Sequence, residues 1–210
     1  SRSRGLGDVY KRQPDNRLEL DSKDKIRKLL TSAYADNNYV TLTELSSDNI
    51  DDIDENNPTT DRSYDEIAHW EEVSGSGNDD PISVWNGYYN AIANSNQALA
   101  SIANLQGEDL SAEMAEALIT RAYNHFNLVN VFAKHYNSQT SETDLGIPYV
   151  TSPEVELNPK YERGTVAEVY RKIAEDIEKA IPLINDNIYT VKTYHFTLKA
   201  CLLYTSDAAD

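Results

Sequence analysis

The sequence predicts an all-α protein made of tetratricopeptide-like helical hairpins joined by long irregular loops. Apolar residues recur three and four residues apart in several separate segments, which is the spacing of one buried helix face. Alternating β-branched residues, which would indicate strands, are nearly absent. Consecutive helical segments are close enough to pair, although no repeat consensus of about 34 residues can be aligned to the chain.

The N-terminal part predicts one regular helix, one short helix and a long loop. Residues 22–35 carry apolar side chains at helical spacing, with Asp21 or Ser22 as the N-cap. Residues 39–49 begin with two leucines on one side and then become wholly polar, so we expect a short helix that gives way to loop. Residues 56–80 are rich in Pro, Gly, Ser and Asn around the segment YDEIAHW. Long irregular segments in compact domains are often functional.

Two long helices are expected to form an antiparallel hairpin in the middle of the chain. The first opens at Pro81, which suits a first helical turn, and the second starts with Ser111 as its cap. About seven residues join them, a length typical of neighbouring antiparallel helices. Trp85 and Tyr88 lie on the apolar face of the first helix, so we expect both to anchor the core. Gly87 lowers helix propensity, which indicates close packing at that point.

The C-terminal part predicts one more helix behind an irregular stretch. Residues 137–163 contain three prolines and little periodicity. The segment TDLGIPYV within them is typical of a fixed turn, in which Gly146 supplies backbone freedom. Thr165 and Glu168 then form a T-x-x-E capping box in front of a helix that we expect to reach residue 184.

The two ends of the chain encode one DNA element in opposite orientations. Residues 201–206 can be encoded by TGTCTCTTATACACATCT, and the reverse complement, read one base in and completed with a G, encodes residues 8–13. This element is the mosaic end of transposase-based sequencing libraries. We therefore expect residues 1–13 and 201–210 to be translated adaptor, and residues 14–200 to be an internal piece of a longer protein.

The charge of the chain excludes some classes of partner. It contains 19 Lys and Arg against 35 Asp and Glu, a formal net charge of −16. Nucleic acid and anionic lipid both need a basic patch, so we expect neither as a partner. The only cysteine is Cys201, so residues 14–200 offer no disulfide and no thiolate chemistry. No apolar run approaches the ~20 residues of a membrane-spanning helix.

No pattern in the sequence supports a catalytic or metal site. Asp52, Asp54 and Asn56 match the first positions of a calcium loop, but Asn57 and Ser63 replace the glycine and the glutamate that such a loop needs. The four histidines lack zinc-binding spacing. Glycosidase chemistry needs two facing carboxylates, and no acidic pair is set apart by its neighbours. We therefore expect no cofactor, no metal and no enzymatic activity.

Polar residues within the predicted helices have structural interpretations. Asn96 lies on an apolar face, where a buried amide would tie helix ends together. Arg121 is expected to be a buried or half-buried ion-pair partner, with Asp48 as the candidate carboxylate. His125 lies in an apolar helix and is expected to be structural.

One segment has the composition of a carbohydrate-binding surface. A sugar presents apolar faces and hydroxyl edges, so its site combines an exposed aromatic ring with Asn, Asp or Arg side chains. The segment between residues 60 and 80 supplies this mixture in Arg62, Tyr64, Trp70, Asn78 and Asp79. The alternative interpretation is that Trp70 only fastens the loop to the scaffold.

Several stretches together resemble the SusD/RagB family of surface nutrient-binding lipoproteins. They are ELSSDN, WNGYYNAIANSNQAL, RAYNHFNLVNVFAKHYN, TDLGIPYV and RGTVAEVYRKIAEDIEKAI, at residues 44–49, 85–99, 121–137, 143–150 and 163–181. Their order and spacing match the N-terminal half of that family. The resemblance implies a tetratricopeptide-like scaffold, a lipid anchor upstream at the outer membrane, and a C-terminal half downstream.

From this resemblance we expect a surface-exposed protein that binds an oligosaccharide and delivers it to a TonB-dependent, SusC-like transporter. Two alternatives stay open. One is a helical scaffold that binds peptide or protein without a sugar site, since the family also includes members proposed to bind peptides. The other is an α/α-barrel glycosidase.

Overall fold

The computed structural model describes residues 20–50, 62–74, 77–154 and 160–184. Within these ranges the chain is helical, apart from irregular connections and one isolated bridge between Leu145 and Thr165. The all-α prediction is therefore confirmed. The helices are α2 (Lys23–Leu30), α3 (Tyr39–Leu45), α4 (Arg62–Ala68), α5 (Pro81–Asn104), α6 (Ser111–Phe132) and α7 (Val166–Ala180), and a 3-10 turn, η2 (Ile181–Leu183), follows the last of them.

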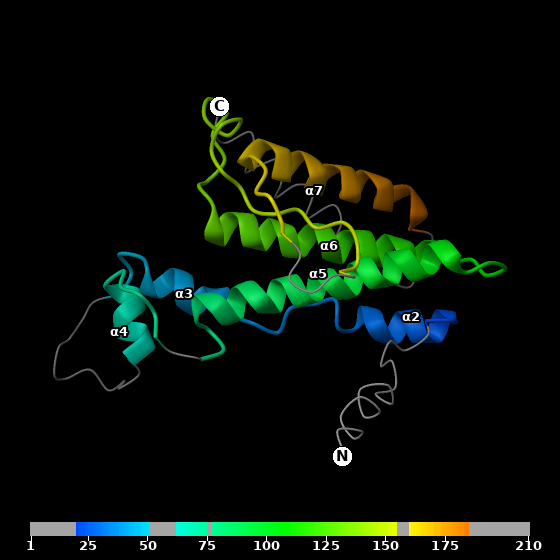
Figure 1. Ribbon diagram of the computed structural model, residues 1–210, viewed down its shortest axis with the longest axis horizontal. Coiled ribbons are helices and arrows are strands. Elements are labelled where there is room, and N and C mark those ends of the chain that lie inside the picture. The colour runs from blue at the N-terminus through cyan, green and yellow to red at the C-terminus, as the bar shows by residue number, and fades with distance from the viewer. Residues whose placement is uncertain (1–19, 51–61, 75–76, 155–159, 185–210) are drawn as a thin grey trace, which may run out of the picture.

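The helices α5, α6 and α7 lie side by side, each antiparallel to the one before it (Figure 1). Helix α2 lies against the C-terminal part of α5, while α3 and α4 gather at the N-terminal end of α5 (Figure 1). The predicted α5–α6 hairpin is confirmed. Among the described helices, none combines the length and the hydropathy needed to cross a membrane.

Helix α5 begins and packs as its sequence predicts. The Asp80 carboxylate accepts the Ser83 N–H at 2.7 Å and caps the helix in front of Pro81. Tyr88 is buried in the core, whereas Trp85 is only partly buried and meets Phe132 edge-on at a centroid distance of 5.1 Å. A Cβ atom at Gly87 would collide with the side chain of Asn37, so the expected close packing is real.

The predicted start of α6 is wrong by one position. Leu110 occupies the N-cap, and Ser111 is the first helical residue. The Asp109 carboxylate instead accepts both donors of Ser111, the backbone N–H at 3.1 Å and the hydroxyl at 2.7 Å. The Ser111 hydroxyl is therefore occupied outside the helix and does not cap it.

Helix α2 ends at Leu30, five residues before the predicted end. Beyond it, the carbonyl oxygen of Ser32 accepts a hydrogen bond of 2.7 Å from Asn94 on α5. The carbonyl oxygen of Ala33 accepts one of 2.9 Å from Asn124 on α6. Contacts between distant segments thus replace the next helical turn, and no local pattern predicts them.

Helix α7 starts at the predicted cap and ends earlier than predicted. The Thr165 hydroxyl accepts the Glu168 N–H at 3.1 Å. The α-helix stops at Ala180 and changes to the 3-10 turn η2, because Pro182 has no N–H with which to continue the i→i−4 hydrogen bonds. Gly146 packs against the start of this helix, where a Cβ atom would lie 2.9 Å from the Thr165 carbonyl oxygen. A glycine is needed at this position because the start of α7 lies so close to it. A left-handed backbone is not the reason, since the described glycine with positive φ is Gly107.

Candidate functional site

Trp70 projects into solvent from the end of the short helix α4. Its φ of 56° lies in the left-handed region, and it is the described non-glycine residue with positive φ. The Trp70 N–H donates to the Ile67 carbonyl at 3.1 Å and the Glu71 N–H donates to the Glu66 carbonyl at 2.8 Å. These two bonds form a Schellman motif, in which glycine normally occupies the left-handed position.

The exposure of Trp70 contradicts the interpretation that it fastens the loop to the scaffold. Trp70 is 79% exposed, more than any other large hydrophobic residue in the described part of the chain. A non-glycine residue in the left-handed region costs about 1–2 kcal/mol. The ring therefore contributes little burial at a position that disfavours it, and such backbone strain is typical of functional positions.

A buried carboxylate, which the sequence analysis did not single out, organises the same region. Glu66 is 3% exposed and accepts hydrogen bonds from Arg62 Nε at 2.6 Å, from the Ser74 N–H at 2.6 Å and from the Ser74 hydroxyl at 2.7 Å. The pKa of Glu66 is lowered, first by the Ser74 N–H and then by the Ser74 hydroxyl. Two features of the sequence could have predicted this buried, paired carboxylate. Glu66 follows Arg62 by four residues, which is the spacing of an ion pair on one helix face, and it is next to the apolar Ile67.

The other predicted site residues fall into two places. Arg62 and Tyr64 lie on α4, where the Arg62 side chain is 81% exposed and Tyr64 is half-buried. Asn78 and Asp79 lie in the turn before α5. Asn37 donates from Nδ2 to both the backbone carbonyl of Asn78, at 3.1 Å, and its side-chain oxygen, at 2.9 Å.

The predicted five residues lie at one end of the molecule. Arg62, Tyr64 and Trp70 belong to α4 and its end, and the turn of Asn78 and Asp79 leads into α5 nearby (Figure 1). In residues 62–74 and 77–80, none of the five is hydrogen-bonded to another. The arrangement is an open surface around one exposed ring.

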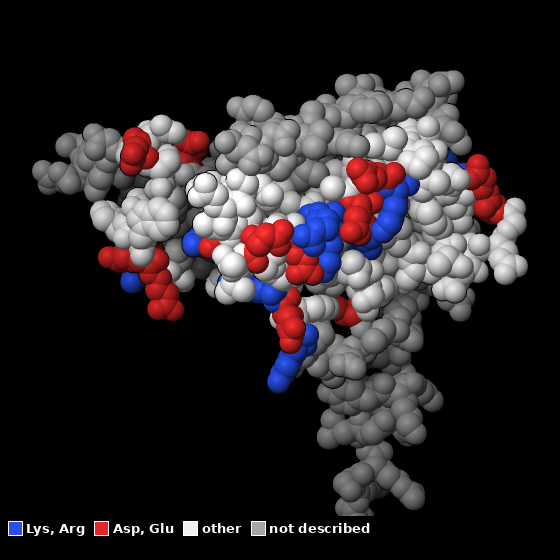
Figure 2. All heavy atoms as spheres, turned by 90° about the horizontal axis from the view of Figure 1, so that it is seen from above, with Lys and Arg blue, Asp and Glu red and all other residues white. Residues whose placement is uncertain are grey.

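The surroundings of Trp70 are acidic. Residues 62–80 contain six Asp and Glu residues and one Arg. The charge visible at the end that carries α4 is mostly acidic (Figure 2). His69 lies within 3.2 Å of the Asp65 carboxylate. Such a surface disfavours anionic ligands and suits an uncharged one.

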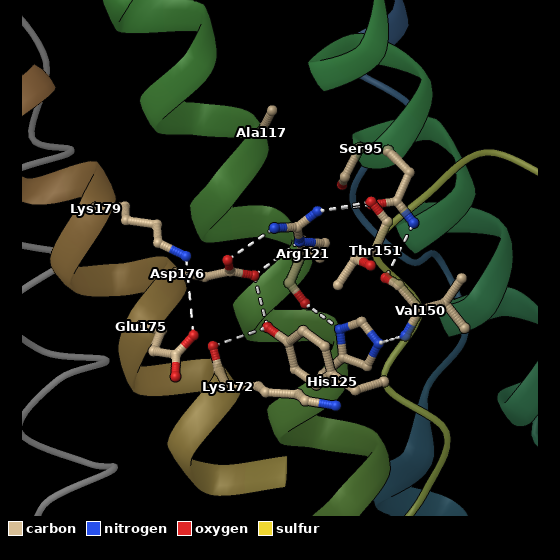
Figure 3. Close-up of polar contacts among 12 residues, drawn as sticks. Ser95, Ala117, Arg121, His125, Val150, Thr151, Lys172, Glu175, Asp176 and Lys179 are labelled. Carbon is tan, nitrogen blue, oxygen red and sulfur yellow. Dashed lines mark hydrogen bonds and ion pairs between the residues drawn. The ribbon is translucent and has the colours of Figure 1, made fainter. Parts of the chain in front are cut away.

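A second polar cluster lies in the core between α5, α6 and α7. Arg121 forms hydrogen bonds of 2.7 Å to both carboxylate oxygens of Asp176, from Nε and from Nη2, and Figure 3 shows the two side chains facing each other. Its Nη1 donates to Asn96 at 3.0 Å, and Asn96 in turn donates to the Val150 carbonyl at 3.0 Å. The predicted pair of Arg121 with Asp48 is wrong, because Asp176 of α7 takes that place.

His125 closes this cluster, and its structural interpretation fits its surroundings. Its Nδ1 lies 2.8 Å from the Arg121 carbonyl oxygen, and its Nε2 accepts the Val150 N–H at 3.1 Å (Figure 3). The ring stacks on Tyr149 at a centroid distance of 3.8 Å. Burial lowers the pKa of His125 to about 3. The neutral form of His125 with the proton on Nδ1 satisfies both contacts. Through these contacts the cluster holds the helices to residues 149–151.

No group of three or more His, Cys, Asp or Glu residues that could hold a metal ion occurs in the described ranges. The candidate calcium ligands Asp52, Asp54 and Asn56 lie outside those ranges.

Comparison with known protein families gives a match that spans most of the chain. Residues 9–207 match the SusD-like family model described as starch-binding and associating with the outer membrane. The matched range includes part of each predicted adaptor segment and does not test that prediction. No curated protein is significantly similar to the chain.

Several solved structures share the fold. A SusD superfamily protein from Bacteroides thetaiotaomicron is 22% identical with a TM-score of 0.68, covering 88% of this chain and 43% of that one. The surface glycan-binding protein A from Bacteroides fluxus is 20% identical, with a TM-score of 0.57 and coverage of 89% and 41%. A laminarin-binding SusD-like protein is 17% identical, with a TM-score of 0.58 and coverage of 90% and 42%. The chain thus spans about two fifths of each structure's length.

Proposed function

The chain belongs to the SusD-like family, and from this premise we propose that it binds an oligosaccharide on the exposed surface around Trp70. The observation that carries the proposal is the combination of a 79% exposed indole with a strained left-handed backbone. An aromatic ring presented in this way can stack on the apolar face of a sugar. Arg62, Asn78 and Asp79 supply donors and acceptors for the hydroxyl edges.

The acidic character of the surface narrows the ligand class. Only Arg62 provides a Lys or Arg cation among residues 62–80, and its Nε is bonded to Glu66. Carboxylated or sulfated glycans would meet repulsion from the surrounding carboxylates. The proposal therefore specifies an uncharged oligosaccharide. The family description and two of the similar structures refer to starch, glycan and laminarin, which supports neutral glucans as first probes.

The wider role follows from the family and is part of the proposal. The protein acts at the cell surface as a lipid-anchored component of the outer membrane. It hands the bound oligosaccharide to a TonB-dependent, SusC-like transporter. It performs no catalysis on the sugar, in keeping with the binding role in the family's description.

Isothermal titration calorimetry of the full chain with a panel of neutral oligosaccharides tests the proposal. Malto-oligosaccharides and laminari-oligosaccharides come first, and each positive ligand is incubated afterwards and analysed for shortened products. Binding heat from at least one glycan without product release is expected. The absence of heat from the whole panel would favour the helical peptide-binding or protein-binding scaffold, and product release would favour a glycosidase.

A further inference from the structure

One residue, Glu66, holds the chain that follows Trp70 at two points. The Glu71 N–H, directly after Trp70, donates to the backbone carbonyl of Glu66 at 2.8 Å and closes the helix end. Further along, the carboxylate of Glu66 accepts the N–H and the hydroxyl of Ser74, at 2.6 Å and 2.7 Å. The three residues between Trp70 and Ser74 thus return to the same helix that presents the indole.

The left-handed conformation of Trp70 is unfavourable for a residue with a side chain, since only glycine populates that region freely. The backbone around Trp70 therefore needs a restraint from other residues. The indole itself supplies little, because it is 79% exposed. Glu66 can supply this restraint, because its carboxylate is buried and charge-assisted hydrogen bonds are roughly twice as strong as neutral ones.

We propose that Glu66 is a positioning residue whose carboxylate, by holding Ser74, keeps Trp70 in its left-handed and solvent-exposed conformation. The benefit to ligand binding rests on the proposed function of the Trp70 surface. A ring that is already ordered loses less conformational freedom when a sugar stacks on it, so the restraint raises affinity. The lowered pKa of Glu66 indicates that the carboxylate remains ionised at neutral pH.

The proposed restraint on Trp70 depends on the negative charge and the two acceptor oxygens of Glu66. In the variant Glu66→Gln, one oxygen becomes an NH2 group that faces donors from Arg62 or Ser74. The helix can still form, since the side-chain size is kept. Asp65→Asn is the matched control, because it removes a neighbouring charge on the same helix from a side chain that is 71% exposed.

Time-resolved fluorescence anisotropy measures the motion of Trp70 directly. The chain has two tryptophans, so the exchange Trp85→Phe leaves Trp70 as the only one. In this protein, Glu66→Gln is expected to increase the sub-nanosecond loss of anisotropy, with a smaller increase for Ser74→Ala, which keeps the N–H donor. Asp65→Asn is expected to leave the decay unchanged. If Trp85→Phe fails to fold, 19F relaxation of 5-fluorotryptophan in the otherwise unchanged chain gives the same information.

Ligand titration separates this inference from the proposed function. Glu66→Gln is expected to weaken binding of the neutral oligosaccharide about two- to ten-fold, which is the cost of ordering one side chain. Unchanged Trp70 motion in Glu66→Gln overturns the positioning role, even if Trp70 binds sugar. Increased motion with unchanged affinity supports the positioning role and counts against Trp70 as the binding surface.

Discussion

Arg121 of α6 donates two hydrogen bonds of 2.7 Å to Asp176 of α7, and both side chains are almost fully buried. The Tyr149 hydroxyl donates to the same carboxylate at 2.6 Å, so the chain segment between the two helices joins the pair. This contact fixes α7 against the α5–α6 hairpin far from the Trp70 surface. Scaffold and candidate site can therefore be tested by separate variants.

Breaking the buried pair should destabilise the fold strongly. Asp176→Asn leaves the Arg121 charge buried without its counter-ion, which costs about 3–5 kcal/mol of unfolding free energy. Urea unfolding followed by far-UV circular dichroism measures it. The control is Glu175→Gln, whose exposed pair with Lys179 spans 3.8 Å and should change stability by less than about 0.5 kcal/mol. Equal effects of the two variants would mean that the buried pair is not what holds α7.

Stability should depend on pH through His125. Its folded pKa of about 3 lies below the ordinary value near 6.5, so the unfolded state binds the proton more readily at intermediate pH. Stability from this residue is complete above pH 6.5 and is lost as the pH falls, by about 1.5 kcal/mol between pH 6.5 and 5. Urea midpoints across that window measure the slope.

The variant His125→Gln should remove most of this slope, whatever its absolute stability. The control His135→Gln changes an exposed histidine and should keep the slope. A chain whose stability is flat from pH 6.5 to 5, or a slope that survives in His125→Gln, would show that His125 is not the group responsible.

The cap of α7 should contribute measurably to stability. In Thr165→Ala the Glu168 N–H loses the hydroxyl that accepts its hydrogen bond at 3.1 Å, which should cost about 1 kcal/mol. The matched control is Ser101→Ala, which removes a hydroxyl bonded within α5 to the Gln97 carbonyl. A midpoint of urea unfolding that does not move in Thr165→Ala would contradict the role of this cap.

The two tryptophans should respond to truncation in opposite ways. Trp70→Gly relieves the left-handed strain and adds chain entropy to the unfolded state, so stability should stay the same or rise by up to about 1 kcal/mol. Trp85→Ala removes a ring packed on Phe132 and Tyr89, which should cost about 3 kcal/mol, the low end for a partly buried aromatic residue. Urea unfolding followed by circular dichroism measures the stability of both variants. A large loss in Trp70→Gly would restore the view that Trp70 fastens the loop.

The sequence predicted those features that depend on neighbours along the chain. Apolar spacing located the α5–α6 hairpin, and Thr165 and Pro81 marked helix starts, because these signals act within one or two turns. The partner of Arg121 and the true end of α2 were not predictable in this way. Both depend on which distant segments meet, and Asp176 lies 55 residues from Arg121.

The candidate site shows the same difference between features set by neighbours along the chain and features set by distant contacts. Composition alone pointed to Trp70, Arg62 and Asn78, because an aromatic residue among polar ones is unusual in a loop. The Schellman geometry at Trp70 could not be predicted, since that position normally needs glycine. Glu66 was missed because its burial depends on Ser74 folding back onto α4.

Calorimetric titration of Trp70→Ala with the neutral oligosaccharide that binds the unchanged chain best is the most direct test of the central claim. Loss of one stacking face should weaken binding by about 1–2 kcal/mol, roughly ten-fold, while Trp85→Phe should bind normally. A Trp70→Ala protein that is folded and binds this oligosaccharide with unchanged affinity would contradict the assignment of the binding surface to Trp70.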